Sequence, residues 1–286
     1  MFVLLAVVSS VLWGTSDFLG GTAAKRLRAL AVVGGSQALA LVGLLVVVVG
    51  TGRLGGILDR PADLLPGVAA GIIGASALGA FYTALSQGTM GVIAPVAALG
   101  TLIPVIVGLA RGEAPSGLQV AGIVLAIAGV VLASGPELSG GASPRPLLLA
   151  VGSALGFGTV AILLADGADH GGVLATVFLM RATSTAVLSV ALLVLLARSR
   201  GARATGLPSR GDLLLLAAIG AGDVGANACF ARATQSGLLS VVSVLGSLYP
   251  VVTAVLAQQV HHERLTRVQV VGVAGALGGV ALLAAG

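Results

Sequence analysis

The sequence predicts an all-α integral membrane protein with ten transmembrane helices arranged as an inverted 5+5 repeat. Three observations predict this fold class: an apolar composition, a series of long apolar runs, and an internal repeat. Of the 286 residues, 57% are hydrophobic and only 9% are charged, whereas a soluble globular protein averages about 25% charged residues. The 15 Lys and Arg and the 10 Asp and Glu are too few to cover such a chain with polar groups. The chain is therefore expected to lie in a lipid bilayer.

The net charge of +5 does not indicate a nucleic-acid partner. A nucleic-acid site needs basic residues clustered on one face, often with stacking aromatics, but Lys and Arg here lie mostly in gaps between apolar runs. The single cysteine, Cys229, excludes an internal disulfide and argues against a Cys-based metal site. His261 and His262 lack further ligands at metal-binding spacing. We expect no metal and no cofactor, and we expect a multi-pass protein of a bacterial cytoplasmic (plasma) membrane.

A helix that spans a bilayer needs about 20 apolar residues, and ten runs of about this length follow one another along the chain. None of them alternates between polar and apolar residues as the strands of a membrane β-barrel do. Segments rich in charge or glycine, such as Lys25–Arg28 and Arg198–Gly211, separate the runs. The ten predicted spans cover residues 2–22, 30–50, 65–85, 90–110, 116–134, 146–165, 172–197, 212–233, 238–258 and 267–285.

The chain contains an internal repeat. The pattern that runs from Ala84 to Leu99 recurs 149 residues later, from Ala233 to Leu248. The pattern that begins at Glu113 recurs 150 residues later, beginning at Glu263. We therefore divide the chain into two five-helix repeats, residues 1–135 and residues 145–286.

Because each repeat has an odd number of spans, the two repeats are expected to cross the membrane in opposite orientations. Inverted repeats of this kind are typical of secondary transporters, whose substrate site lies near the membrane midplane between the repeats. The alternative is that duplication merely produced a larger bundle. The inverted pair favours transport, because it supplies two alternative gates around one site.

Four ionisable residues fall inside predicted spans, where a charge costs from about 2.5 kcal/mol upward at the helix centre. Arg181 and Asp223 lie near the middles of the seventh and eighth spans, and would form an ion pair facing the bundle interior if those helices are neighbours. This pair is either structural or part of a substrate or proton site. Arg232 lies near a helix end and is expected to extend its guanidinium to the interface.

The fourth ionisable residue, Asp17, lies one turn after Trp13 on the same face of the first span. An acid beside an aromatic ring could bind a cationic or amine-bearing substrate, or carry a coupling proton or cation. The alternative is an ion pair with Lys25 or Arg26.

Neutral polar side chains inside the spans extend the predicted substrate cavity, since no water is available there to satisfy them. Asn227 lies one turn from Asp223 and shares its face. The remaining neutral members of the predicted cavity are Trp13, Thr15, Ser16, Gln37 and Tyr82. For each residue alone, bonding between helices is an alternative role.

Small-residue motifs at Gly67-x3-Gly71 and Gly275-x3-Gly279 predict close helix contacts, either inside the bundle or, alternatively, in a homodimer. Three prolines lie inside predicted spans and are expected to bend helices or serve as hinges. They are Pro95, Pro104 and Pro250. Glu113 and Glu263 precede predicted helix starts and are expected to cap those helices, where negative charge is favoured.

These motifs together resemble the EamA-type transporters of the drug/metabolite transporter superfamily. The resemblance rests on Leu12-Trp13-Gly14-Thr15-Ser16-Asp17-Phe18 and on Pro104…Gly112-Glu113…Gln119…Gly122…Gly129, which recurs as Pro250…Glu263…Gln269…Gly272…Gly279. It implies ten helices in an inverted 5+5 arrangement, a central cavity, and export of metabolites, amino acids or drugs. The second repeat departs from the pattern, because Gly156-Phe157-Gly158 stands where the first repeat has its Trp.

The orientation in the membrane stays open. Gaps that follow odd-numbered spans hold ten Lys and Arg and the others hold four, so the positive-inside rule places both termini outside. The resemblance implies the opposite.

The leading functional hypothesis is a secondary-active exporter of small molecules that works by alternating access. The rivals are a passive facilitator of the same fold, an intramembrane enzyme and a receptor-like protein. An enzyme would need a compact acid–base set, whereas the acids and histidines here are scattered along the sequence.

Overall fold

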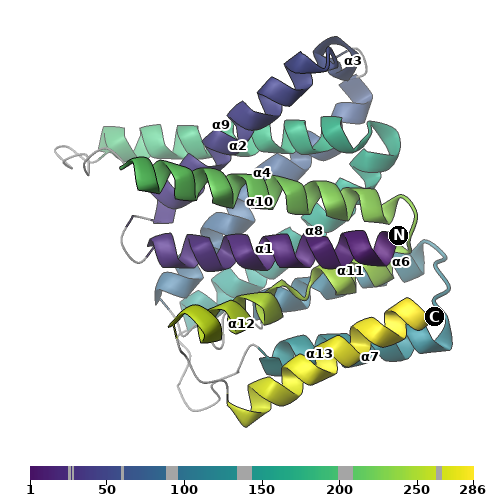
Figure 1. Ribbon diagram of the computed structural model, residues 1–286. Helices are drawn as coiled ribbons and strands as arrows, with labels where there is room; N and C mark the ends of the chain where they lie inside the picture. Colours follow the sequence, from purple (N-terminus) through teal and green to yellow (C-terminus); the bar gives the residue numbers. More distant parts are fainter. Residues whose placement is uncertain are drawn as a thin grey trace.

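The computed structural model describes residues 1–24, 27, 29–58, 61–87, 96–133, 144–198, 209–261 and 266–286. Within these ranges every regular element is a helix, which confirms the all-α class. The elements are α1 (Phe2–Ala24), α2 (Ala29–Gly50), α3 (Leu54–Leu58), α4 (Pro61–Gln87), the 3-10 helix η1 (Leu99–Thr101), α6 (Leu102–Ala110), α7 (Gly117–Ala133), α8 (Pro144–His170), α9 (Val173–Arg198), α10 (Arg210–Thr234), α11 (Leu239–Gly246), α12 (Tyr249–His261) and α13 (Arg267–Ala285). Figure 1 shows both chain termini, Met1 and Gly286, at the same end of the bundle, which we call the termini end.

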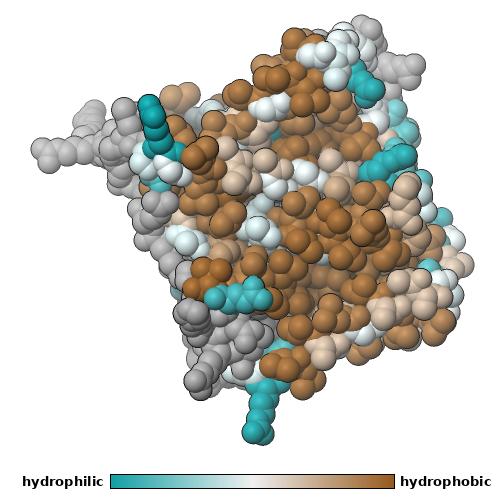
Figure 2. Space-filling view, viewed as in Figure 1, coloured by the Kyte–Doolittle hydropathy of each residue, from teal (hydrophilic) through white to brown (hydrophobic). Residues whose placement is uncertain are grey.

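Seven helices of the described chain are long and apolar enough to cross a membrane: α1, α2, α4, α8, α9, α10 and α13. Shorter apolar segments cover Val96–Ala110, Gly117–Leu132 and Leu239–Thr253, which coincide with the predicted fourth, fifth and ninth spans. Large hydrophobic side chains lie on the outer surface, such as Leu214 (73% exposed) and Leu148 (70% exposed). Figure 2 shows a broad hydrophobic band between ends where hydrophilic side chains gather. The chain is thus built for lipid, while the count of ten spans stays a prediction.

Two predicted boundaries were wrong. The sixth span was expected to end at residue 165, but α8 continues through Asp166 to His170, and the chain turns later, at Gly172, which has a φ of +83°. The predicted span 238–258 is interrupted at Ser247 and Leu248, where α11 ends and α12 begins. Pro250 is the second residue of α12 and has no N–H with which to continue an earlier helix, so its ring fits the start of a new one.

The most extensive helix pairings join the two predicted repeats. Helix α7 packs on α13, α4 on α8 and α9, and α1 on α10 and α12. Two mixed bundles result: bundle A consists of α1, α2, α10, α11 and α12, and bundle B consists of α4, η1, α6, α8 and α9. Each bundle therefore contains helices from both repeats, and α7 with α13 forms a separate pair at one side (Figure 1).

The small-residue motifs lie inside this packing, as one of the two interpretations predicted. A Cβ at Gly67 would lie 2.9 Å from the backbone oxygen of Thr176 on α9, and a Cβ at Gly279 would lie 2.8 Å from Cα of Ala126 on α7. Both motifs therefore bring helix backbones close together within one chain. A homodimer would have to use another face.

Replacing Gly129 by alanine is expected to lower stability, because the new Cβ would lie 2.7 Å from Cα of Ala276 and 2.8 Å from the backbone oxygen of Gly272. Overpacking of this kind costs about 1–3 kcal/mol. Gly43 on α2 is the matched control, since a Cβ there meets nothing within 4 Å. There the alanine should stabilise the helix, by up to about 1 kcal/mol. Thermal unfolding of the two purified variants in detergent checks the difference, and equal midpoints would contradict the close packing of α7 on α13.

Candidate functional site

A central cavity lies between bundles A and B. Its volume is ≈ 170 Å³, whereas a cavity of about 10–15 Å³ on the same measure holds one water molecule, so it has room for a small solute. Aliphatic and aromatic side chains form most of its wall, and its polar members come from α1, α2, α9, α10 and the two interrupted helices. The polar and aromatic residues that line it are Trp13, Asp17, Gln37, Phe81, Thr101, Phe157, Ser184, Asp223, Asn227, Phe230, Ser243, Ser247 and Tyr249.

Interrupted helices from both repeats meet at this cavity. In the first repeat the 3-10 turn η1 precedes α6, and in the second repeat the break after α11 precedes α12. The two interruptions occupy equivalent places, because Leu99 corresponds to Leu248 in the internal repeat. The Thr101 hydroxyl donates to the backbone oxygen of Ser243 at 3.0 Å, so the two segments touch directly. A 3-10 stretch within a helix often marks a functional hinge, and helices with a break commonly form substrate and ion sites in transporters.

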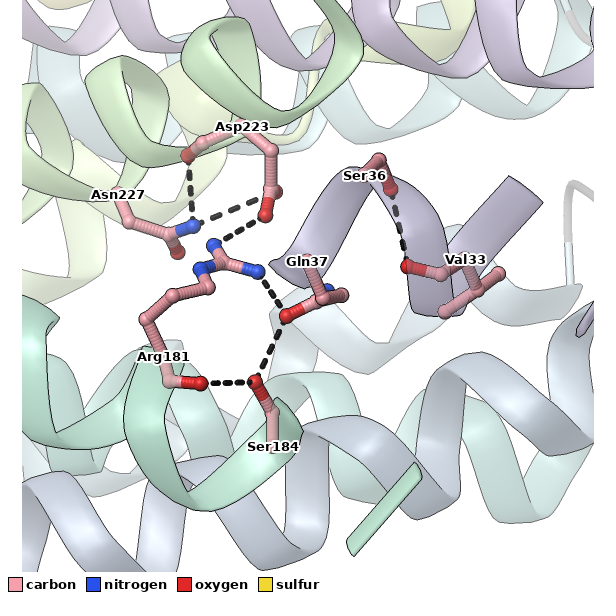
Figure 3. A network of polar contacts seen from close by, with 7 residues as sticks. All are labelled: Val33, Ser36, Gln37, Arg181, Ser184, Asp223 and Asn227. Carbon is pink, nitrogen blue, oxygen red and sulfur yellow. Dashed lines mark hydrogen bonds and ion pairs between the residues drawn. The ribbon is translucent and has the colours of Figure 1, made fainter. Parts of the chain in front are cut away.

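A buried ion pair stands beside the cavity, as the sequence predicted. Arg181 on α9 is 1% exposed, and its guanidinium contacts Asp223 on α10 and donates to the side-chain oxygen of Gln37 on α2. Figure 3 shows Arg181 extended between these two partners. Since isolated charges are costly in the membrane interior, this arrangement fixes α9 against α2 and α10.

Two further side chains complete the network around Arg181. The Ser184 hydroxyl donates to the Gln37 side-chain oxygen at 2.7 Å (Figure 3). The Asn227 amide donates to the backbone oxygen of Asp223 at 2.7 Å and to its carboxylate at 3.3 Å. The shared face predicted for Asn227 and Asp223 is thus confirmed, and the Asp223 carboxylate has partners on two helices.

Asp17 differs from Asp223 in its surroundings. It lines the cavity, yet within the described part of the chain its carboxylate accepts no hydrogen bond and forms no ion pair. Lys25 and Arg26, the partners considered in the sequence analysis, lie outside the described residues. Trp13, one turn earlier on α1, faces Phe230 of α10 with ring centroids 5.6 Å apart. The predicted acid-and-aromatic pair therefore lies on the cavity wall.

The other predicted site residues lie as follows. The Thr15 hydroxyl donates to the backbone oxygen of Val11 at 2.7 Å, and Ser16 is buried beside Gly222 of α10. Neither is among the described residues that line the cavity. The Tyr82 side chain lies outside the described residues. The role of the predicted residues in binding a substrate stays a prediction.

Several residues that line the cavity were not predicted from the sequence, although the internal repeat could have indicated them. Phe157 and Gly158 occupy in the second repeat the places of Trp13 and Gly14, and both line the cavity. The same register aligns Asp17 with Ala161, another lining residue. The site is therefore built from equivalent positions, but only the first repeat supplies a carboxylate there.

Glu113 has a different partner from the one predicted. Helix α6 ends in a Schellman motif, in which Gly112 has a φ of +91° and the Glu113 N–H donates to the Gly108 oxygen at 3.1 Å. The Glu113 carboxylate then accepts from the backbone N–H groups of Leu239 at 2.5 Å and Ser240 at 3.0 Å. It thus caps α11 of the other bundle, not the helix that follows it.

Helix α7, which follows Glu113 in the chain, has its own cap. The Ser116 N–H donates to the Gln119 side chain at 2.9 Å, and the Gln119 N–H donates to the Ser116 hydroxyl at 3.2 Å. The prediction that Glu113 caps this helix was therefore wrong. Glu263, its counterpart in the second repeat, lies outside the described residues.

Comparisons with known proteins place this geometry in context. A family model described as the EamA-like transporter family matches residues 1–135 and 144–285, which together span nearly the whole chain. No curated protein matches. A solved structure described only as "Crystal structure of protein" covers 98% of this chain and 95% of its own, with a TM-score of 0.79 and 18% sequence identity. At that identity the likeness shows the fold alone.

Proposed function

Since the chain belongs to the EamA-like transporter family, a family of membrane transporters within the drug/metabolite transporter superfamily, we propose that it is a secondary-active exporter of small organic molecules. Metabolites, amino acids and drugs are the proposed range of substrates, and a bacterial plasma membrane is the proposed location. The observation that carries the proposal is the central cavity. Its wall is mostly apolar but contains two carboxylates, and interrupted helices of both repeats lie beside it. The proposed substrate binds there.

We propose that bundles A and B, rather than the two sequence repeats, are the bodies that move during alternating access. The extensive pairings of α4 with α8 and of α1 with α10 join the repeats. A movement that separated the repeats would therefore break both pairings and uncover the apolar surfaces that these helices bury against each other. Moving bundle A against bundle B keeps those pairings. The contacts between the bundles are fewer and include polar ones, made by Arg181, Glu113 and Thr101. In the proposed movement the network of Arg181 with Gln37 and Asp223 stays intact, whereas the hydrogen bonds of Glu113 and Thr101 are exchanged between two states.

The direct test is flux in proteoliposomes that contain the purified protein, with amines, amino acids and drugs offered on either side. A carrier is expected to accumulate at least one of them in response to an imposed proton or sodium gradient. Absence of flux in both directions across the whole panel would overturn the proposal.

Coupling through Asp17 is tested by Asp17→Asn, which keeps the size of the side chain and removes its charge. We expect gradient-driven uptake to fall about tenfold or more, since a charge-assisted contact is worth about 1.5–3 kcal/mol, while Asp166→Asn, outside the cavity, behaves as the wild type. A passive facilitator would instead show flux that ignores both gradients and is nearly unchanged by the substitution.

A further inference from the structure

We propose that the central cavity selects small organic cations, with a substrate ammonium group against the Asp17 carboxylate and the apolar body beside Trp13 and Phe230. This inference rests on the proposed transport function and names the substrate class of the same site. Three observations carry it: the sign of the charges that face the cavity, the unequal pairing of its two acids, and the aromatic wall.

The charges that reach the cavity are negative. Among the described residues that line it, Asp17 and Asp223 are the acids, and no Lys, Arg or His is present. The nearby guanidinium of Arg181 is 1% exposed and is not part of the lining, because Gln37 and Asp223 hold it behind the wall. A substrate carboxylate would therefore meet the like charge of Asp17 and would not reach the Arg181 guanidinium, which already pairs with Asp223. This excludes the anion-selective interpretation that the presence of an arginine near the site would otherwise suggest.

The two acids are not equivalent. Asp223 is already engaged by Arg181 and by the Asn227 amide, so its charge is largely balanced. The Asp17 carboxylate has no hydrogen bond or ion pair within the described part of the chain. An unbalanced carboxylate in a membrane interior is costly, and a ligand cation that pairs with it removes this cost. Asp17 is thus the group at which the substrate charge is expected to lie.

The wall beside Asp17 suits the rest of such a molecule. The Trp13 and Phe230 rings lie 5.6 Å apart and tilted by 45°, and the faces of aromatic rings attract cations. Gly246 keeps this corner open, since a Cβ there would lie 3.2 Å from the Phe230 ring and 3.4 Å from the Trp13 ring. The Ser243 hydroxyl, which is buried in the same wall, has no hydrogen-bond partner among the described residues. An N–H donor of the ligand can use it.

The protein carries its own reporter for this site, because Trp13 is its single tryptophan. We would titrate the purified protein in lipid nanodiscs with three compounds that share one carbon skeleton: phenethylamine, 2-phenylethanol and 3-phenylpropionate. The cation is expected to change Trp13 emission saturably and to bind about 10- to 100-fold tighter than the neutral alcohol, as a charge-assisted contact predicts. The carboxylate is expected to bind more weakly than the alcohol.

Asp17→Asn should abolish this preference, so that phenethylamine and the alcohol bind alike, and Asp17→Glu should restore it at least in part. Asp166→Asn, whose carboxylate pairs with Arg111 outside the cavity, is the matched control and should bind as the wild type. Retained binding of the alcohol shows that Asp17→Asn has kept the folded cavity. Equal binding of the amine and the alcohol by the wild type, or a preference for the carboxylate, would overturn the proposal.

The same compounds separate this inference from the proposed function. Asp17-dependent binding of the amine without any flux would overturn transport and support the cation site. Flux of the carboxylate or the alcohol that is indifferent to Asp17 would support transport and overturn the cation site.

Discussion

Replacing Arg181 by methionine is expected to destabilise the protein by about 3–5 kcal/mol, one of the largest effects of a single substitution in this chain. Arg181 is 1% exposed and holds Gln37 and Asp223 together. Its removal leaves the Asp223 carboxylate without its cation in the membrane interior. Removing one partner of a buried pair costs this much because the remaining charge is uncompensated. The measurement is the thermal unfolding midpoint of the purified variant, compared with that of the wild type in the same detergent.

The double variant Arg181→Met, Asp223→Asn tests whether the loss of stability in Arg181→Met comes from the uncompensated charge of Asp223 or from lost packing around the arginine. With both charges absent no uncompensated charge is left, and such double replacements are often close to neutral. Most of the lost stability should therefore return. If the double variant is as unstable as Arg181→Met alone, the loss arises from the volume and hydrogen bonds of the arginine rather than from its charge.

A second ion pair in the chain supplies the matched control. Arg111 and Asp166 join α6 to α8 through two hydrogen bonds, at 2.6 Å and 3.0 Å. The two pairs differ in their arginines, since the Arg111 side chain is 49% exposed and that of Arg181 is 1% exposed, while Asp166 and Asp223 are similar at 31% and 29%. The hydrogen bonds to Asp166 raise the pKa of the Arg111 guanidinium above its ordinary value. Exposed pairs contribute about 0–1 kcal/mol. Arg111→Met should therefore shift the unfolding midpoint far less than Arg181→Met does.

The sequence was sufficient to predict the membrane class and the two acids of the cavity wall, Asp17 and Asp223. Charges inside apolar runs are rare and costly, so Arg181 and Asp223 stood out, and their pairing follows from the need to neutralise both. Trp13 and Asp17 stood out by one-turn spacing on one face. Position within a helix therefore predicts which side chains share a wall.

The sequence could not predict contacts set by three-dimensional packing between distant helices. Glu113 precedes a helix with its own capping box, so local rules assigned it to that helix; only the packing of α6 beside α11 shows its true partner. The repeat pattern likewise gave no information on which helices of the two repeats pack on each other, as α4 does on α8 and α1 on α10. Whether two apolar helices pack on each other depends on surface shape, and apolar faces that all resemble one another in sequence carry little information about it.

Glu113 leads to the second large effect: Glu113→Ala is expected to open the termini end of the cavity. Its carboxylate joins bundle B to bundle A by accepting from the first two N–H groups of α11. Figure 1 shows the start of α11 and the end of α6 near the termini end. Hydrogen bonds to a charged group contribute about 1.5–3 kcal/mol each. A net loss of about 2 kcal/mol would shift the balance between closed and open states roughly 30-fold.

Thiol accessibility measures this shift, because Cys229 is the one native cysteine and Cys229→Ser provides a thiol-free background. A cysteine introduced at Ser243 in the cavity wall would be labelled with a membrane-impermeant maleimide, added to each side of oriented vesicles in turn. We expect labelling from the termini end to become faster by an order of magnitude or more in Glu113→Ala. Asp166→Asn is the control at the same end, because the Arg111–Asp166 pair joins two helices of bundle B and does not connect the bundles. Its labelling rate should match that of the unmodified background, and equal rates in all three proteins would show that Glu113 does not hold bundle A against bundle B.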